Sequence, residues 1–190
     1  MAIYIIEHLE PELFEWCLIE YEHISETVGA ENLWFTNIKN KTDATKLSKF
    51  GKVFSESTRD MKINLQNTCV LDPAAKDLLK PGEKFEYFIF GGILGDYPPK
   101  RRTGPELTQF LAGAMLRHIG KHQMSTDNAV FTVKKIASGV DFKNLKFKDG
   151  VSIKLNEFEN VDLPYRYNLV DGKPFISERI INYLKNKDGF

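Results

Sequence analysis

The sequence predicts an α/β protein with a mostly parallel β-sheet flanked by helices. Short apolar runs rich in β-branched and aromatic residues alternate with segments of helical periodicity. The run at residues 87–90, Tyr-Phe-Ile-Phe, is apolar throughout, which is typical of a strand covered on both faces. Strands separated by helices imply right-handed crossovers and parallel pairing. The chain has 190 residues without a repeat or a shift of composition, so we expect one domain over residues 1–190.

The N-terminal half carries most of the predicted sheet. We expect strands at residues 3–6, 32–35, 68–71 and 86–90. Pro11 opens the first predicted helix, because its fixed φ and missing N–H suit the first helical position, and Gly29 ends that helix. A short helix is predicted at residues 43–50.

The last part of the chain predicts two more helices and then an antiparallel element. The helices are expected at residues 104–116 and 126–138, with a short strand at 116–119 between them. Residues 151–155 alternate like a half-exposed strand. The segments 165–169 and 173–176 flank Asp171-Gly172, which predicts a hairpin, and residues 178–184 predict a closing helix.

Composition narrows the class of protein. Lysine plus arginine and aspartate plus glutamate are equal at 26 each, whereas nucleic-acid-binding proteins usually carry a basic excess. The N-terminus lacks the features of a signal peptide, and no apolar run approaches the roughly 20 residues that span a bilayer. Cys17 and Cys69 have neither metal-binding nor disulfide spacing and are expected to be buried thiols. We therefore expect a cytoplasmic protein without a membrane segment.

The most informative segment is the glycine-rich loop after the strand at 86–90. It reads Gly91-Gly92-Ile93-Leu94-Gly95-Asp96, and it is neither a dinucleotide fingerprint nor a P-loop. Glycines directly after a buried strand let backbone approach a ligand or another backbone segment. Ligands of open α/β sheets bind at the carboxyl ends of strands. The loop is therefore a candidate ligand site, with a tight turn as the structural alternative.

Two other loops are candidates for the same site. The stretch from Ile119 and Gly120 to Gln123, Met124 and Ser125 contains a flexible segment whose amides suit an adenosine pocket. Capping of the next helix is the alternative role for Ser125, Thr126 and Asp127. Leu71-Asp72-Pro73 is either part of a ligand site or a plain turn in which Asp72 bonds its own backbone.

Other motifs give weaker signals. The four histidines show no metal-ligand spacing, so no metal is expected. Lys100, Arg101 and Arg102 form a basic island beside the glycine loop, and such an island is either a solvated surface or a contact for an acidic substrate or RNA.

Six segments together resemble one family. They are IIEH at 5–8, GAENL at 29–33, LDP at 71–73, YFIFGGILGD at 87–96, QMSTD at 123–127 and PYRY at 164–167. The chain resembles the SPOUT class of S-adenosylmethionine-dependent methyltransferases, and within it the yeast-type protein-arginine methyltransferases that modify a small-subunit ribosomal protein. The sequence departs from the family at Ser125, His118 and residues 100–104, positions expected at the rim of the pocket.

The resemblance implies a SPOUT fold with a C-terminal trefoil knot, followed here by a hairpin and a helix. It implies S-adenosylmethionine as cofactor, held by the three candidate loops. These cofactor-binding candidates are Leu71, Asp72, Pro73, Gly91, Gly92, Ile93, Leu94, Gly95, Ile119, Gly120, Gln123, Met124 and Ser125. SPOUT enzymes are commonly dimers through the knot, but we favour a monomer for a protein-arginine methyltransferase.

Three carboxylates are candidates for orienting a guanidinium and accepting its proton. We rank Asp96 first, because the glycine loop is expected to hold it near the methyl donor, then Glu7 and Asp127. The favoured substrate is an arginine of a small-subunit ribosomal protein. Transfer or ribosomal RNA, contacted by Lys100, Arg101 and Arg102, is the first alternative, and a non-catalytic ribosome-assembly or nucleotide-binding module is the second.

Overall fold

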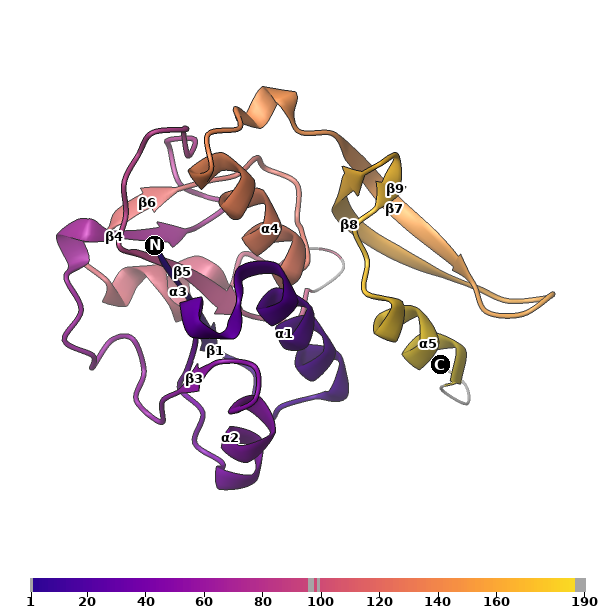
Figure 1. Cartoon of the computed structure of the whole chain (residues 1–190), viewed down its shortest axis with the longest axis horizontal. Coiled ribbons are helices and arrows are strands. Elements are labelled where there is room, and N and C mark those ends of the chain that lie inside the picture. The colour runs from indigo at the N-terminus through magenta and orange to yellow at the C-terminus, as the bar shows by residue number, and fades with distance from the viewer. Residues whose placement is uncertain (1, 96–97, 99, 187–190) are drawn as a thin grey trace.

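The computed structural model describes residues 2–186 except 96, 97 and 99, and its centre is a parallel sheet (Figure 1). Within these residues six strands pair in the order β3-β2-β1-β5-β4-β6, and every pair is parallel. The strands are β1 (Ile3–His8), β2 (Leu33–Thr36), β3 (Lys52–Val53), β4 (Thr68–Leu71), β5 (Tyr87–Gly92) and β6 (Met115–Arg117). This arrangement confirms the predicted α/β class.

Helices cover the sheet and close the described chain. They are α1 (Glu15–Val28), α2 (Lys41–Leu47), α3 (Thr103–Glu106), α4 (Thr126–Ala137) and α5 (Glu178–Asn186), with 3-10 turns at Ala30–Asn32, Leu65–Asn67, Thr108–Phe110 and Phe142–Asn144. Gly29 ends α1 with a φ of 86°, as its sequence position predicts. Asn40 caps α2 by accepting hydrogen bonds from the N–H groups of Thr42 and Asp43, so this helix begins before the predicted residue 43.

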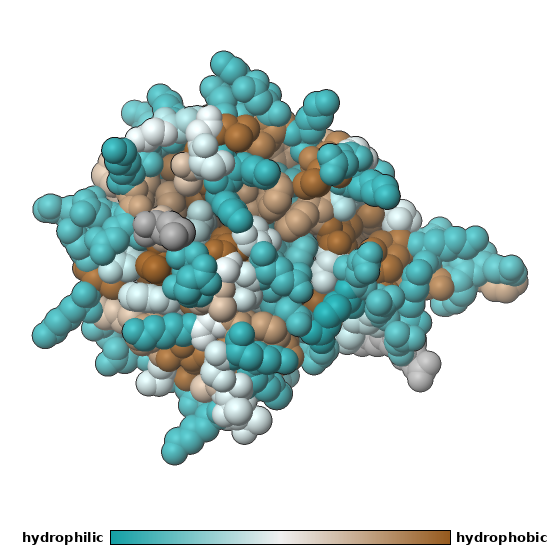
Figure 2. Space-filling view, in the orientation of Figure 1, coloured by the Kyte–Doolittle hydropathy of each residue, from teal (hydrophilic) through white to brown (hydrophobic). Residues whose placement is uncertain are grey.

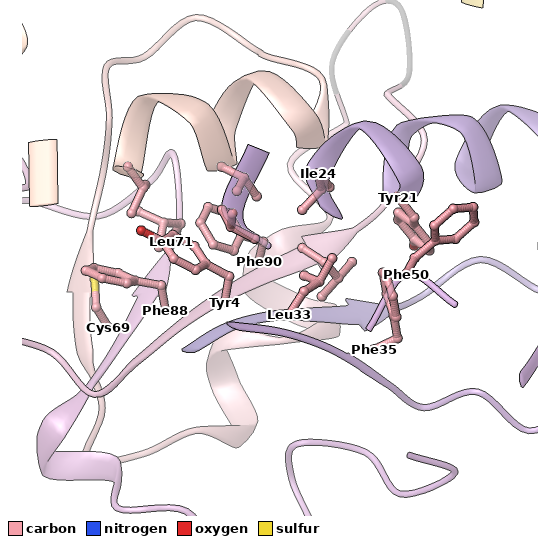
Figure 3. Close-up of a cluster of buried hydrophobic side chains, with 14 of the residues drawn as sticks. Tyr4, Tyr21, Ile24, Leu33, Phe35, Phe50, Cys69, Leu71, Phe88 and Phe90 are labelled. Carbon is pink, nitrogen blue, oxygen red and sulfur yellow. The ribbon is translucent and has the colours of Figure 1, made fainter. Parts of the chain in front are cut away.

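Alternate residues of the strands face two different cores. One core joins Tyr4, Phe88 and Phe90 to α1 and α4, and Figure 3 shows these rings together, with Leu33 between them and Phe35. On the other face, buried β-branched side chains of β1, β4 and β5 pack against Leu107 and Leu111. Burial on both faces explains why the central strands have continuously apolar sequences. Both cysteines are free and buried, as predicted.

The C-terminal part adds an antiparallel sheet. Within the described chain it contains β7 (Phe147–Lys154), β8 (Asn160–Val170) and β9 (Lys173–Pro174). Asp171 and Gly172 both have positive φ, and they join β8 to β9 as the predicted hairpin turn. The longer hairpin of β7 and β8 extends away from the rest of the molecule (Figure 1). We call this hairpin the arm.

Two predicted helix boundaries are wrong. The first helix begins at Glu15 instead of Pro11, because Leu9 N continues the sheet bonding to Gly92 O and Phe14 is still extended, with ψ of 151°. The predicted helix at 104–116 is broken after Glu106. Leu107 and Leu111 leave helical geometry to bury their side chains, and Gly113, with φ of 105°, turns the chain into β6. Core packing therefore overrides local helical periodicity in this segment.

Candidate functional site

The three loops predicted to bind cofactor follow three neighbouring strands. Residues 71–73 follow β4, residues 91–95 end β5, and residues 119–125 come after β6. The order β5-β4-β6 and the parallel pairing place the carboxyl ends of these strands at one edge of the sheet. Ligands of open α/β sheets bind at this edge. The structure therefore brings the predicted loops together.

Gly95 lies at the contact between the glycine loop and the loop at 119–125. A Cβ at this position would lie 2.5 Å from Cε1 of Tyr165 and 2.6 Å from Nε2 of Gln123. The hydroxyl of Tyr165 donates to Gly95 O at 2.7 Å. Leu94 N donates to Oε1 of Glu10 at 2.8 Å, which ties the same loop to the segment after β1. Only a glycine fits the space at residue 95 without moving these neighbours.

Gly92 makes room for a buried pair beneath the loop. A Cβ here would lie 2.3 Å from the Tyr21 hydroxyl, which is hydrogen-bonded to Nδ1 of His8 at 2.9 Å. Burial lowers the pKa of His8, although Glu10 opposes that shift. The neighbouring Gly91 is in contact with Ile93, whose side chain would lie 3.1 Å from an added Cβ. The end of β5 is thus closely packed against β1 and α1.

The Asp72 loop has the geometry of a turn. Oδ1 of Asp72 accepts a hydrogen bond from Ala74 N, and Oδ2 accepts one from Thr108 Oγ1. Leu71 is buried at the end of β4, whereas Pro73 is exposed. This is the plain turn that the sequence suggested as an alternative to a ligand site. Because the Asp72 side chain is used in the turn, Leu71 and Pro73 are the parts of this loop that are available to line a ligand site.

The loop at 119–125 is held between the sheet and the arm. Gly120 has a φ of 94° and packs on Phe142, Ile119 is buried, and Gln123 O accepts from Arg166 N at 2.8 Å. Thr132 Oγ1 donates to the Met124 sulfur. A hollow of about 310 Å³ opens beside this loop, and its walls are Lys121, His122, Gln123, Asp149, Pro164, Tyr165 and Arg166.

Glu7 is a fully buried carboxylate that joins three segments. Its oxygens accept hydrogen bonds from Thr36 Oγ1 in β2, from Ser57 Oγ and from Thr58 N. Such saturation is typical of a structural carboxylate. Asp96, the first-ranked catalytic candidate, lies outside the described residues.

Asp127 belongs to a second buried cluster, at the start of α4. Its Oδ2 accepts from Nδ1 of His23 at 2.7 Å, and its Oδ1 accepts from Ser125 Oγ at 2.6 Å and Asn128 N at 2.8 Å. Burial, reinforced by the charge of Asp127, raises the pKa of Glu20 to about 8. Asp127 thus fixes the end of the loop at 119–125, and Ser125 donates to it instead of capping α4 directly.

The basic island is partly neutralised. Arg102 Nη1 donates to Oε1 of Glu10 at 2.8 Å, and the same guanidinium forms two hydrogen bonds with Glu106. Arg101 is exposed, and Lys100 also interacts with another group of the protein. Of the three predicted substrate contacts, Arg102 is therefore part of the scaffold that holds the glycine loop.

Two residues of this region were not predicted from the sequence. Glu10 links Leu94 to Arg102, and its position two residues after β1 was the available signal. Tyr165 comes from the arm, 70 residues after Gly95, so only the tertiary fold brings it to the loop. Among the described residues no group of three histidine, cysteine or acidic side chains is arranged to hold a metal ion. Nor is any helix in that part of the chain long and apolar enough to cross a membrane.

Comparisons with known proteins place this geometry in a family. A profile described as "Protein arginine N-methyltransferase SFM1-like" matches residues 3–189. The protein arginine N-methyltransferase SFM1 of Saccharomyces cerevisiae is 36% identical over 199 residues, covering 96% of this chain and 93% of the relative.

Solved structures agree with this match. The crystal structure of yeast arginine methyltransferase SFM1 complexed with SAM has a TM-score of 0.87 and 34% identity, covering 97% of this chain and 90% of the other. Crystal structures of the yeast enzyme with SAH and MTA also match, with TM-scores of 0.87 and 0.84.

A more distant match concerns the fold alone. The crystal structure of a dual specific Trm10 from Thermococcus kodakaraensis has a TM-score of 0.56 at 19% identity, covering 75% of this chain and 95% of that one. These neighbours confirm the predicted SPOUT class, while the trefoil knot stays a prediction. On the family profile and the yeast relative, the chain belongs to the SFM1-like family of protein arginine N-methyltransferases.

Proposed function

We propose that the protein is an S-adenosylmethionine-dependent methyltransferase that modifies an arginine side chain of another protein. The observation that carries this proposal is the convergence of three strand-end loops, with Gly95 packed closely on Gln123 and Tyr165, in a chain of the SFM1-like family. Yeast SFM1 has been crystallised with SAM, SAH and MTA, which supports the same cofactor here.

The residues present fit an adenosine-containing cofactor. Ligand pockets are mostly apolar with a few polar groups, and the converging loops offer Leu71, Ile93, Leu94 and Ile119 together with backbone and the Gln123 amide. Gly91, Gly92, Gly95 and Gly120 keep backbone free of Cβ atoms at this edge. The remaining cofactor contacts are proposed at Asp72, Pro73, Met124 and Ser125. When bound, S-adenosylmethionine supplies an electrophilic methyl group.

The substrate guanidinium sets the demands on the protein. It is planar and stays protonated near neutral pH, so one N–H proton must leave as the nitrogen takes up the methyl group. A carboxylate satisfies both needs, because it binds two guanidinium N–H groups side by side and accepts the proton. Alignment of the nitrogen with the methyl group accounts for much of the expected acceleration.

Asp96 is the proposed carboxylate, because it follows Gly95 directly in the sequence. The geometry of the other two candidates supports a different role. Glu7 is saturated by hydroxyl and amide donors, and Asp127 holds His23, Ser125 and Asn128. We propose that these two carboxylates position the loops around the reacting groups.

An arginine of a small-subunit ribosomal protein is the proposed substrate, on the family resemblance of the sequence, and a cytoplasmic location belongs to the same proposal. RNA is the less favoured substrate. Arg102 is committed to Glu10 and Glu106, which reduces the positive charge that the basic island offers to phosphate.

We also propose that residues 1–190 form one domain that acts as a monomer. Ile19 of α1 is buried against the arm and α5, in one cluster with Leu163 and Ile180. Asn128 of α4 donates to Phe175 O and accepts from Asn168 N, both in the C-terminal part. Parts of the surfaces of α1 and α4 are thus covered by the chain itself, whereas Glu26, Lys134 and Lys135 are exposed. Sedimentation equilibrium tests this, and a stable dimer contradicts it.

Methyl transfer tests the function directly. The purified protein is incubated with methyl-labelled S-adenosylmethionine and an extract of a strain that lacks it. We expect label in a protein band that resists nuclease and contains methylated arginine. Asp96→Asn should lower the rate at least 100-fold, since general-base help contributes roughly 10²–10⁴-fold, while Asp60→Asn, an exposed carboxylate, should not. Label in a nuclease-sensitive fraction would instead identify RNA as the substrate.

Cofactor binding is tested separately by calorimetry. Gly95→Ala pushes Gln123 and Tyr165 away from the glycine loop, so we expect a large loss of affinity for S-adenosylmethionine. Gly104→Ala is the matched control, because nothing lies within 4 Å of the added Cβ. Binding without transfer to any protein or RNA would support a non-catalytic module.

A further inference from the structure

The arm ends in a phenylalanine that the fold does not bury. Phe158 is 94% exposed, whereas the next most exposed large apolar side chain among the described residues, Phe110, is 46% exposed and packs against the Arg59 guanidinium at 3.8 Å. A single partly exposed apolar residue is normal in proteins, but a fully exposed phenyl ring at a projecting tip is unusual.

The turn that carries Phe158 is built by its own hydrogen bonds. Oδ1 of Asn156 accepts from the N–H groups of Phe158 and Glu159, at 2.9 and 3.0 Å. Leu155 N donates to Glu159 O at 3.0 Å, which closes the turn. The ring is therefore presented on an ordered turn, and ordering a contact residue before binding lowers the entropic cost of association.

The arm is anchored against α1 and α5 along much of its length. Ile153 and Leu163 are buried with Ile19 of α1 and with Ile180 and Leu184 of α5. The strands then continue beyond this contact to the pair Lys154 and Asn160, and Figure 1 shows their turn far from the sheet. Leu155 and Val161 are partly buried against the same cluster, so only residues 156–160, which include the turn that carries Phe158, are exposed throughout.

The far end of the arm carries negative charge around the ring. Glu157, Glu159 and Asp162 are exposed, against the single lysine Lys154 in residues 154–162. Figure 2 shows the projecting end as a mainly hydrophilic surface with a small apolar part. This charge attracts basic surfaces and repels the phosphates of RNA.

The same strand connects the tip to the candidate site. Tyr165 in β8 donates to Gly95 O, and Pro164 and Arg166 line the hollow beside Gln123. Tyr165 lies five residues along β8 from Asn160, where the strand leaves the turn, which is roughly 17 Å at about 3.3 Å per residue. A folded protein is large enough to span this distance, so one that presents an arginine at the site can contact the tip with a second part of its surface.

We propose that the tip of the arm, Phe158 with Glu157 and Glu159, is a docking site for the protein that is methylated. The ring enters an apolar pocket of that protein, and the carboxylates pair with basic side chains around the pocket. Aromatic anchors in such pockets carry a large share of interface energy. This proposal rests on the proposed function, and it adds a contact that recognises the folded partner rather than the arginine.

The test separates docking from chemistry. The variants are Phe158→Ala, the pair Glu157→Gln with Glu159→Gln, and the control Val170→Ala, a 39%-exposed residue at the other end of β8. The probes are protein extract from a strain lacking the enzyme and a short peptide centred on the arginine that the wild-type enzyme labels. Melting temperature and S-adenosylmethionine affinity are measured for each variant.

For Phe158→Ala we expect about a tenfold higher half-saturating extract concentration, which corresponds to about 1.4 kcal/mol. The maximal rate, the rate on the peptide, cofactor affinity and melting temperature should match those of the wild type and of Val170→Ala. The glutamine pair should make the half-saturating concentration less sensitive to added salt.

Each other outcome overturns a specific statement. No protein label with the wild-type enzyme would refute the proposed function and the partner of the arm with it. Protein label with an unchanged half-saturating concentration in Phe158→Ala would refute the docking site alone. A slower reaction on the peptide or weaker cofactor binding would make Phe158 a structural residue, and a changed label only in the nuclease-sensitive fraction would make the partner RNA.

Discussion

The end of β1 and the start of α4 each bury a carboxylate, but the two are surrounded by different groups. Glu7 is held by Thr36, Ser57 and Thr58, all of them neutral donors from other segments. Asp127 is held by His23 and Ser125 and lies near a second buried carboxylate, Glu20. The first arrangement links pieces of chain, whereas the second also contains a group that titrates within the neutral range.

Because their partners differ, the two buried carboxylates stabilise the region around the candidate site in different ways. At Glu7 each donor lies in a segment that the carboxylate joins to β1, so the acid acts as a cross-link. At α4 burial, together with the like charge of Asp127, raises the pKa of Glu20 and so makes its protonation part of folding. Neither arrangement leaves a carboxylate with the open oxygens that a substrate guanidinium needs, which is why the proposed base is Asp96.

The largest loss of stability is expected for Glu7→Gln. The amide NH₂ would face donors that now bond to a carboxylate, which leaves buried groups without partners. We expect the free energy of unfolding in urea to fall by about 3 kcal/mol, the upper part of the range for buried groups that lose their hydrogen-bond partners. Glu12→Gln, at an exposed position, is the control and should change it little. Equal stability of the two variants would show that Glu7 is not a cross-link.

A smaller loss is expected for Gly92→Ala, on the same side of the molecule as Glu7. The methyl group would collide with the Tyr21 hydroxyl and break its hydrogen bond to His8. Overpacking of this kind costs about 1–3 kcal/mol. Urea unfolding measures the loss, and Gly104→Ala is again the control because its Cβ has open space. If Gly92→Ala is as stable as Gly104→Ala, the end of β5 is less tightly packed than the contacts of Gly92 in the structure indicate.

At the second carboxylate, His23→Gln should cost about 1 kcal/mol, a typical value for one hydrogen bond. Asp127 would keep the donors Ser125 and Asn128, so the loss is partial. His23 also stacks on Phe175, with ring centroids 4.3 Å apart, and that contact is weakened as well. Thermal unfolding measures the effect, and a loss as large as that of Glu7→Gln would remove the distinction between the two carboxylates.

The sequence predicted the parts of the molecule whose local pattern agrees with the fold. The central strands, the end of α1 at Gly29 and the turn at Asp171-Gly172 follow from apolar runs and glycine positions. The helix predicted at 104–116 failed because Leu107 and Leu111 are spaced for a helix but serve a core on the far face of the sheet. No local pattern carries that information.

The candidate site shows the same limit. The three loops were predicted from glycines and strand ends, and the parallel sheet places them at one edge. The contacts that fix their geometry come from Glu10 and Tyr165, which are distant from the glycine loop in sequence. The sequence also made Arg102 a candidate for contact with the substrate, but in the fold its guanidinium is hydrogen-bonded to Glu10 and Glu106. Hydrogen bonds and ion pairs between residues distant in sequence therefore decide which candidate side chains are available to a ligand.

At acidic pH the smallest change in melting temperature is expected for Glu20→Gln. This variant tests the difference between the two buried carboxylates most directly. The pKa of Glu20 is raised on folding, from 4.5 to about 8, so the folded state binds a proton that the unfolded state releases. The stability contributed by this group is present at pH below 4.5 and is lost as pH rises toward 8. Glutamine resembles the protonated acid and still accepts from Trp16 Nε1.

The melting temperature of Glu20→Gln should therefore match that of the wild type near pH 4 and exceed it increasingly up to pH 8, the upper end of the window set by Glu20. Glu26→Gln, an exposed position of the same helix, should follow the wild type throughout. If all three proteins show parallel pH profiles, folding does not raise the pKa of Glu20. The start of α4 would then be a permanent cross-link like the end of β1, and the pH response of the fold would have to come from groups elsewhere.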